Sequence, residues 1–258
     1  MNNLNYNISG SGRTLIFQHG LGANLEQAQD LAGKIPGWQV VSMDCPGHGK
    51  SLITGENFPS FANYTENLVR LMDSLKIDRA VFGGISMGSG ISLSMAIHHP
   101  DRVEGLILVR PAWLAEKRPP NLEILLKLVP FLTLPNGQAE FEKLAEFQTI
   151  VQILPSAAKS ILGQFTRDQG EATETILTRM VNDAPFENLS ELHLIRQPAV
   201  VIANDDDPLH PLDMGKVIAK ELPKAKFQKV TSRYMNNEKH TSEVRKIIAS
   251  FLNQIKNS

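Results

Sequence analysis

The stretch Ala80-Val81-Phe82-Gly83-Gly84-Ile85-Ser86-Met87-Gly88-Ser89-Gly90 decides the fold of this chain. Its apolar start predicts a buried strand, and the residues from Ile91 to Ile97 predict a helix. Ser86 therefore stands at the apex of a sharp turn from strand to helix. Gly84 and Gly88 fit this geometry, because side chains two residues either side of the serine would collide with the strand and the helix.

Such a turn would present the Ser86 hydroxyl in a cleft and direct the first amides of the following helix at the same point. Those amides and the helix dipole favour an anion there. Because the pattern is short, an ordinary loop rich in glycine and serine is the alternative. The position between a strand and a helix favours the functional interpretation.

The size and charge of the chain say little about its fold class, but they argue against two kinds of partner. With 258 residues the chain can bury one large core, as α/β domains of this length do. Its 26 basic and 27 acidic residues are well mixed and give a net charge of −1. We therefore expect no nucleic-acid partner and no membrane-surface partner.

The sequence also bears on the cellular compartment. Cys45 is the only cysteine, which excludes an intramolecular disulfide and fits a reducing compartment. The first residues resemble no signal peptide. The most apolar segment, Leu122–Leu134, is interrupted by charged residues and proline and is too short to span a bilayer. We expect a soluble, cytoplasmic protein.

Strands and helices alternate through most of the chain. Apolar runs predict strands over Thr14–Gln18, Trp38–Met43, Ala80–Phe82, Val103–Val109, Pro198–Ala203 and Ala225–Val230. Helical spacing predicts helices between them, over Phe61–Lys76 and Leu212–Leu222 for example, and a last helix at the C-terminus. This alternation predicts an α/β fold with a mostly parallel central sheet and helices on both faces.

The alternation stops between Ala112 and Leu194, where only helical patterns occur. We expect residues 1–111 and 195–258 to form the core domain and residues 112–194 to form a helical cap, or lid, inserted into it. Within this insertion the sequence predicts one helix over Phe141–Leu154. A separate helical domain is the weaker alternative, because the strand pattern resumes at Pro198.

Polar residues gather where the predicted strands end, the edge at which open parallel sheets bind ligands. A serine at this edge needs a base to accept its proton, and the base needs an acid to hold its tautomer. Both should follow the serine in the order Asp, then His. The acidic turn Asp205-Asp206-Asp207 and His240 stand in that order.

Five motifs together resemble an α/β-hydrolase of the capped, serine-esterase type. They are His19-Gly20, Asp44-x-Pro46-Gly47-His48-Gly49-x-Ser51, Gly84-x-Ser86-x-Gly88, Asp207-Pro208-x-His210-Pro211, and His240 with its trailing helix. They occur in the family's order and cover almost the whole chain except the insertion. One departure is Ala203-Asn204, where family members often carry a glycine shortly before the acid.

The resemblance assigns catalytic roles to three residues. Ser86 would be the nucleophile and His240 the general base and then acid. Asp207, which immediately precedes Pro208, best matches the acid position, and Asp206 is the fallback.

The resemblance also implies an oxyanion hole made by the backbone N–H groups of Leu21 and Met87. The side chains of Leu21 and Met87 would then form apolar pocket walls, and Trp113 would lie at the junction with the lid. His19 and His48 would hold loops through hydrogen bonds. His210 would support the acid turn.

A dinucleotide site is a rival interpretation. Gly20-x-Gly22 follows a strand, and Asp44 ends the next one, but Leu25 occupies the third glycine position and would prevent close packing of helix and strand. No two histidines have metal-ligand spacing with carboxylates. We expect neither a metal nor another cofactor.

The sequence thus predicts a serine hydrolase that cleaves an ester or related acyl bond of a small, largely apolar substrate through an acyl-enzyme. Acyl transfer or a lyase-type reaction on the same triad is one alternative. A non-catalytic ligand-binding protein with a vestigial triad is another. The oligomeric state, including a homo-oligomer, is left open.

Overall fold

A seven-stranded sheet in the order β1-β3-β2-β4-β5-β6-β7 forms the centre of the computed structural model, which describes residues 4–55, 57–167 and 170–256. The strands are β1 (Tyr6–Gly10), β2 (Arg13–Gln18), β3 (Trp38–Met43), β4 (Ala80–Ile85), β5 (Val103–Val109), β6 (Ala199–Ala203) and β7 (Ala225–Lys229). Only β1 is antiparallel to its neighbour, and the remaining pairs are parallel. The predicted fold class is therefore confirmed.

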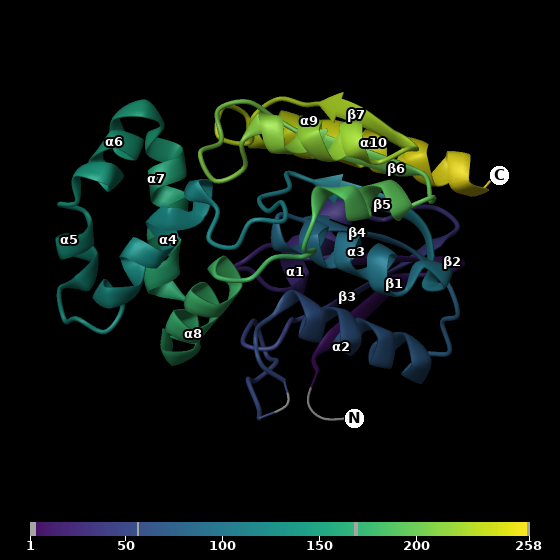
Figure 1. Ribbon diagram of the computed structural model, residues 1–258, viewed down its shortest axis with the longest axis horizontal. Coiled ribbons are helices and arrows are strands. Elements are labelled where there is room, and N and C mark those ends of the chain that lie inside the picture. Colours follow the sequence, from purple (N-terminus) through teal and green to yellow (C-terminus); the bar gives the residue numbers. More distant parts are fainter. Residues whose placement is uncertain (1–3, 56, 168–169, 257–258) are drawn as a thin grey trace.

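Helices cover both faces of this sheet (Figure 1). Alternate residues of each central strand point to opposite faces, so Phe82 and Leu106 lie in one core cluster and Val81 and Ile107 in the other. The first cluster includes side chains of α2 (Phe61–Ser74), α3 (Met87–His98) and α9 (Leu212–Glu221). The second includes those of α1 (Leu25–Ala32) and α10 (Asn237–Lys256).

Between β5 and β6 the described chain forms helices. They are η2 (Pro120–Leu122), α4 (Glu123–Leu128), η3 (Val129–Phe131), α5 (Gly137–Phe141), α6 (Ala145–Ile153), α7 (Pro155–Leu162), η4 (Gly163–Thr166), α8 (Gly170–Val181) and η5 (Leu189–Leu194). Of these, α4 to α8 lie together at one end of the molecule (Figure 1), whereas η5 packs on α3 and α9 of the core. A further short helix, η1 (Pro100–Arg102), precedes β5. That the insertion acts as a lid stays a prediction.

Two local expectations need correction. The single helix predicted over Phe141–Leu154 is broken, because Leu144 adopts extended backbone (φ −63°, ψ 132°) between α5 and α6. Strand β1 was not predicted. It is an edge strand with mostly exposed side chains, so it lacks the apolar run that marks the central strands.

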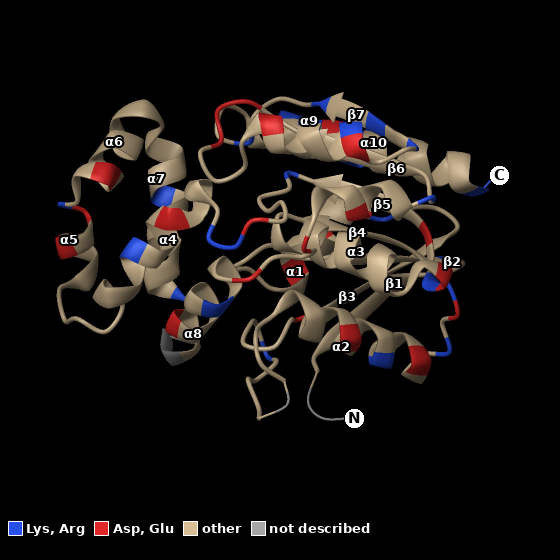
Figure 2. Ribbon diagram, in the orientation of Figure 1, with Lys and Arg blue, Asp and Glu red and all other residues tan. Residues whose placement is uncertain are grey.

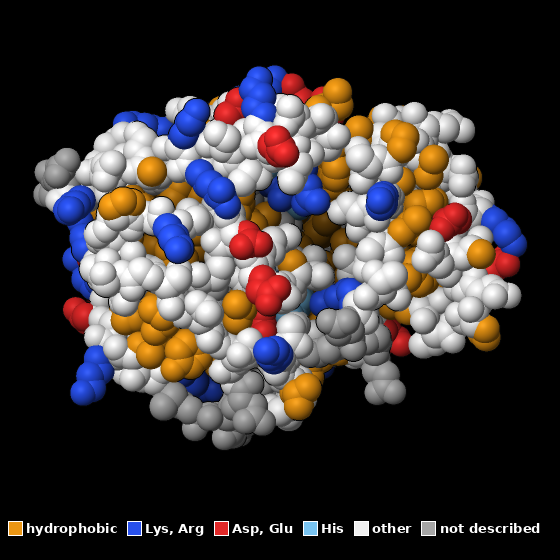
Figure 3. All heavy atoms as spheres, turned by 180° about the vertical axis from the view of Figure 1, so that it is seen from behind, with side chains coloured by type: hydrophobic (Ala, Val, Ile, Leu, Met, Phe, Trp, Pro, Cys, Tyr) orange, Lys and Arg blue, Asp and Glu red, His pale blue; other side chains and the backbone are white. Residues whose placement is uncertain are grey.

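Charge is distributed without a dominant sign, and Figure 2 shows acidic and basic residues interspersed over the helices and strands. Figure 3 shows a hollow between the insertion and the rest of the molecule, with basic side chains at its edge. Among the described helices, no segment has both the length and the apolar character needed to cross a membrane.

Candidate active site

Ser86 occupies a strained turn between β4 and α3. Its backbone has φ 55° and ψ −108°, in the region that residues other than glycine rarely adopt, and its N–H donates to the Val109 carbonyl at 2.9 Å. A Cβ at Gly88 would lie 2.4 Å from the Gln18 carbonyl oxygen, and one at Gly84 would lie 2.6 Å from the Gly88 carbonyl carbon. These contacts explain why glycine flanks the serine on both sides.

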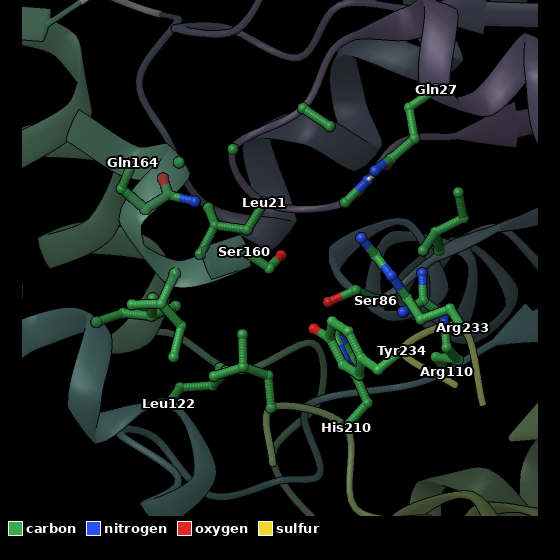
Figure 4. A pocket seen from close by; sticks show the side chains of 18 of the residues that line it. Leu21, Gln27, Ser86, Arg110, Leu122, Ser160, Gln164, His210, Arg233 and Tyr234 are labelled. Atoms are coloured by element: carbon green, nitrogen blue, oxygen red, sulfur yellow. Dashed lines mark hydrogen bonds between the residues drawn. The ribbon is translucent and has the colours of Figure 1, made fainter. Parts of the chain in front are cut away.

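The Ser86 side chain opens into a cavity of about 180 Å³ beyond the carboxyl ends of the central strands (Figure 4). One wall is apolar and includes Leu21, Trp113, Leu122, Leu125 and Ile161. The opposite wall is polar and includes Gln27, Arg110, His210, Arg233 and Tyr234, whereas the polar Ser160 lies beside Leu21 (Figure 4). The cavity is therefore less apolar than the sequence predicted.

Only two of the three residues that we expected to line the substrate pocket do so. Leu21 and Trp113 do line the Ser86 cavity. The Met87 side chain does not, because it points into the core and is fully buried there.

Two backbone amides near Ser86 lack acceptors. Met87 begins α3, so its N–H has no intrahelical acceptor. Leu21 N–H donates to no acceptor in the described part of the chain, whereas the neighbouring Gly20 N–H donates to Gln27 Oε1 at 2.9 Å. The use of the Leu21 and Met87 amides as an oxyanion hole stays a prediction.

Asp207 follows β6 and is the buried member of the three consecutive aspartates, whereas Asp206 is exposed. Its Oδ1 accepts a hydrogen bond from His210 Nδ1 at 2.8 Å, and its Oδ2 accepts one from Arg110 Nη1 at 3.3 Å. Burial alone would raise the pKa of Asp207, but the neighbouring His210 and Arg110 outweigh it and lower this pKa to about 2. Asp207 is therefore ionised at neutral pH.

The Asp207 carboxylate sets the state of the His210 ring. An ionised carboxylate can only accept, so Nδ1 of His210 carries the proton and Nε2 is left as the basic nitrogen. Burial lowers the pKa of His210 despite the attraction of Asp207, which keeps the ring neutral. His210 and Ser86 line the same cavity (Figure 4). No hydrogen bond joins the Ser86 hydroxyl to a histidine in the described chain.

No hydrogen bond joins His240 to Asp207 in the part of the chain that the structure describes, so the role of general base that the resemblance implied for His240 stays a prediction. His240 lies in the first turn of α10, its Nδ1 donates to the Thr231 carbonyl at 2.8 Å, and its buried Nε2 has no partner among the described residues. It lines a neighbouring cavity that does not include Ser86. Tyr234, from the segment before α10, lines the Ser86 cavity instead.

His19 and Asp44 hold loops around the site. Buried His19 receives the Cys45 N–H on Nε2 at 3.1 Å, and its Nδ1 lies 2.9 Å from the Gly20 carbonyl. Asp44 accepts the N–H groups of Leu25 and Lys50, at 2.7 Å and 2.9 Å. Its oxygens are thus occupied by the chain itself, which argues against the dinucleotide interpretation. His48, the other loop histidine, has neither ring nitrogen paired in the described chain, although its ring lies 4.9 Å from that of His19.

Comparison with known proteins identifies the family to which this fold belongs. A sequence model of the α/β hydrolase fold family matches residues 13–234, which is more than half of the chain. The chain belongs to the α/β-hydrolase fold family.

Several members of the α/β-hydrolase family are similar over most of their length. A 2-hydroxy-6-oxononadienedioate/2-hydroxy-6-oxononatrienedioate hydrolase of Paraburkholderia phymatum is 29% identical over 87% of this chain and 81% of its own. A poly(3-hydroxyalkanoate) depolymerase of Ectopseudomonas oleovorans is 25% identical over 93% of this chain and 84% of its own. The thermophilic esterase of Thermogutta terrifontis has the same fold, with a TM-score of 0.73 at 18% identity, over 98% of this chain and 93% of its own. The chain is thus a member of a family whose similar proteins include a 2-hydroxy-6-oxononadienedioate/2-hydroxy-6-oxononatrienedioate hydrolase and a poly(3-hydroxyalkanoate) depolymerase.

Within this α/β-hydrolase, sequence reasoning assigned no place in the substrate cavity to four residues of its polar wall, namely Arg110, His210, Arg233 and Tyr234. Two of these four residues could have been assigned to the site from the sequence. Arg110 directly follows a predicted strand, at the edge where ligands bind, and His210 stands three residues after the predicted acid. Arg233 and Tyr234 could not, because they lie in an irregular segment whose path depends on packing.

Proposed function

We propose that this protein is a serine hydrolase that cleaves an ester or related acyl bond of a small substrate. Ser86 is the nucleophile, His210 the general base and Asp207 the acid that orients it. The observation that carries this proposal is that the strained Ser86 shares a cavity with a histidine whose Nδ1 is held by a buried, ionised carboxylate. The hydrolases among the relatives support the same reaction class.

The proposed reaction begins when Nε2 of His210 takes the Ser86 proton and Oγ bonds to the substrate carbonyl carbon. The carbonyl electron pair moves to oxygen, where the N–H groups of Leu21 and Met87 stabilise the charge. The intermediate then expels the alcohol, which takes the proton from His210. Water, deprotonated by the same histidine, releases the acid and restores Ser86.

The first test is covalent labelling with a fluorophosphonate probe, followed by peptide mapping. We expect modification of Ser86 in the wild type and no labelling of Ser86→Ala, because only an activated serine attacks such probes. We also expect hydrolysis of a short 4-nitrophenyl ester to fall by about 10³-fold or more in Ser86→Ala. A folded wild type that neither labels nor hydrolyses would support the non-catalytic alternative.

A second pair of variants decides which histidine is the base. We expect His210→Ala to lower kcat/KM by about 10³-fold, and His240→Ala by less than about tenfold. Both proteins need native circular dichroism for the comparison. A larger loss of kcat/KM in His240→Ala than in His210→Ala would show that His240 is the general base, as the sequence favoured.

A further inference from the structure

The polar wall of the Ser86 cavity contains a buried arginine with unused hydrogen-bonding capacity. Arg110 is only 4% exposed, yet its backbone has φ 48°, where a non-glycine residue is strained. One nitrogen, Nη1, lies 3.3 Å from Asp207, and buried Nε has no partner in the described part of the chain. Leaving a charged donor buried and unpaired is costly, so Arg110 Nε is available to a ligand in this cavity.

A second guanidinium borders the same cavity. Arg233 lies on the segment between β7 and α10, and its Cζ is 5.0 Å from the centroid of the Tyr234 ring. It makes no ion pair with an acidic side chain of the described residues. Figure 4 shows Arg110 and Arg233 close to Ser86 and on the side away from Leu122.

The charges around Ser86 do not balance. Arg110 and Arg233 contribute two positive charges and Asp207 one negative charge, while burial lowers the pKa values of His210 and His240 and keeps both rings neutral. The neighbouring cavity is lined by one acidic residue, Asp30, and a further basic one, Arg245, whose charges offset each other, and Arg245 Nη2 donates to the backbone carbonyl of Asp30. One positive charge at the Ser86 cavity therefore remains uncompensated.

We propose that the substrate cleaved at Ser86 carries a single carboxylate, which Arg110 and Arg233 bind inside the cavity. This inference rests on the proposed function and narrows its substrate class. A carboxylate presents two oxygens in the plane of a guanidinium and brings one negative charge, whereas a phosphate monoester dianion exceeds the charge available. The apolar wall, with Leu21 and Trp113, receives the hydrocarbon part.

The cavity also limits the size of this substrate. About 180 Å³ is room for a short acid. A half-ester of a short dicarboxylic acid meets these conditions, and monomethyl glutarate is a suitable probe. Dimethyl glutarate is its neutral counterpart, and methyl 4-phosphonobutyrate carries the larger anion.

The test compares kcat/KM for these three esters. We expect the wild type to prefer monomethyl glutarate over dimethyl glutarate by at least about tenfold, and Arg233→Gln to lose most of this preference. Arg245→Gln is the matched control, because Arg245 lines the neighbouring cavity but not the Ser86 cavity, and it should keep the wild-type ratio. Preference for the neutral ester or for the phosphonate by the wild type would overturn the inference.

A binding arm separates this inference from the proposed hydrolysis. Ser86→Ala is titrated with glutarate by calorimetry, with and without Arg233→Gln. We expect binding by Ser86→Ala that weakens at least about tenfold when Arg233 is replaced. This result would support the anion site even if Ser86 proves unreactive. Undetectable glutarate binding by folded Ser86→Ala would overturn the inference. The outcome of the labelling experiment, which tests the proposed function, does not depend on either result. Arg110 is not varied, because its loss would leave the Asp207 carboxylate partly unpaired in the core.

Discussion

At the scale of single residues, the site depends on a serine held in an unfavourable backbone conformation. A left-handed, non-glycine residue costs about 1–3 kcal/mol, so Ser86 persists in this conformation only because its surroundings hold it. The Ser86 N–H bond to Val109 and the close approach of Gly88 to Gln18 supply that constraint. Packing of backbone against backbone thus maintains the position of the nucleophile.

We therefore predict that Gly88→Ala destabilises the protein by about 1–3 kcal/mol. The added Cβ would lie 2.4 Å from the oxygen and 2.8 Å from the carbon of the Gln18 carbonyl, and neither backbone atom can move without disturbing β2. Urea denaturation measures the free energy of unfolding. Gly163→Ala is the matched control, because a Cβ there would meet nothing within 4 Å, and its stability should be unchanged or slightly raised. Equal stability of both variants would contradict this explanation of the glycine.

At the scale of elements, the insertion has an aromatic centre of its own. Phe141 is fully buried at the end of α5, and its ring centroid lies 4.8 Å from that of Phe147 and 5.8 Å from those of Phe131 and Phe165. These rings come from η3, α5, α6 and η4. These helices are too short to be stable alone, and this cluster of four phenylalanine rings holds them together.

We predict that Phe141→Ala loosens the insertion more than the sheet. Removing a buried phenylalanine costs about 3–5 kcal/mol, and the loss falls on helices that depend on this cluster. Hydrogen exchange should become faster in α5 to α7, while β4 and β5 stay protected. Ile153→Ala, on α6 but with a side chain 76% exposed, should leave exchange unchanged. Equal acceleration throughout the molecule would instead mean that insertion and sheet unfold as one unit.

At the scale of the whole molecule, stability should depend on pH through buried neutral histidines. His19 and His240 are 0% and 3% exposed, and burial lowers the pKa of each from 6.5 to about 4. Between pH 6.5 and 4 the unfolded chain binds protons that the folded chain does not, so stability falls as pH falls. Asp207, with a pKa lowered from 3.8 to about 2, contributes stability that is lost only below this window.

We predict that the free energy of unfolding declines between pH 7 and pH 4, and that His240→Gln makes this decline shallower because one of the buried histidines is removed. Urea denaturation across this pH range measures both slopes. Exposed His98, at the end of α3, provides the control variant His98→Gln. A His240→Gln slope equal to that of the wild type would show that protonation of His240 is not linked to unfolding.

Local patterns predicted much of the fold. Strands β3 and β5 were predicted to the residue, because each is a short apolar run bounded by polar or turn residues. Ser86 was identified for a similar reason, since its turn depends on sterics within a few residues. The break at Leu144 and the exposed strand β1 were missed, because in both cases packing outweighs the local pattern.

The sequence by itself determined the α/β alternation, the strand-to-helix turn at Ser86 and the order in which a serine, an acid and two histidines follow one another. Tertiary structure alone decided which histidine pairs with Asp207 and that Arg110, 97 residues earlier in the chain, reaches the same carboxylate. The physical reason is the distance along the chain over which each effect acts. Periodicity and turn sterics act over a few neighbouring residues, whereas the partners of a buried charge are set by how distant segments pack at the end of the sheet.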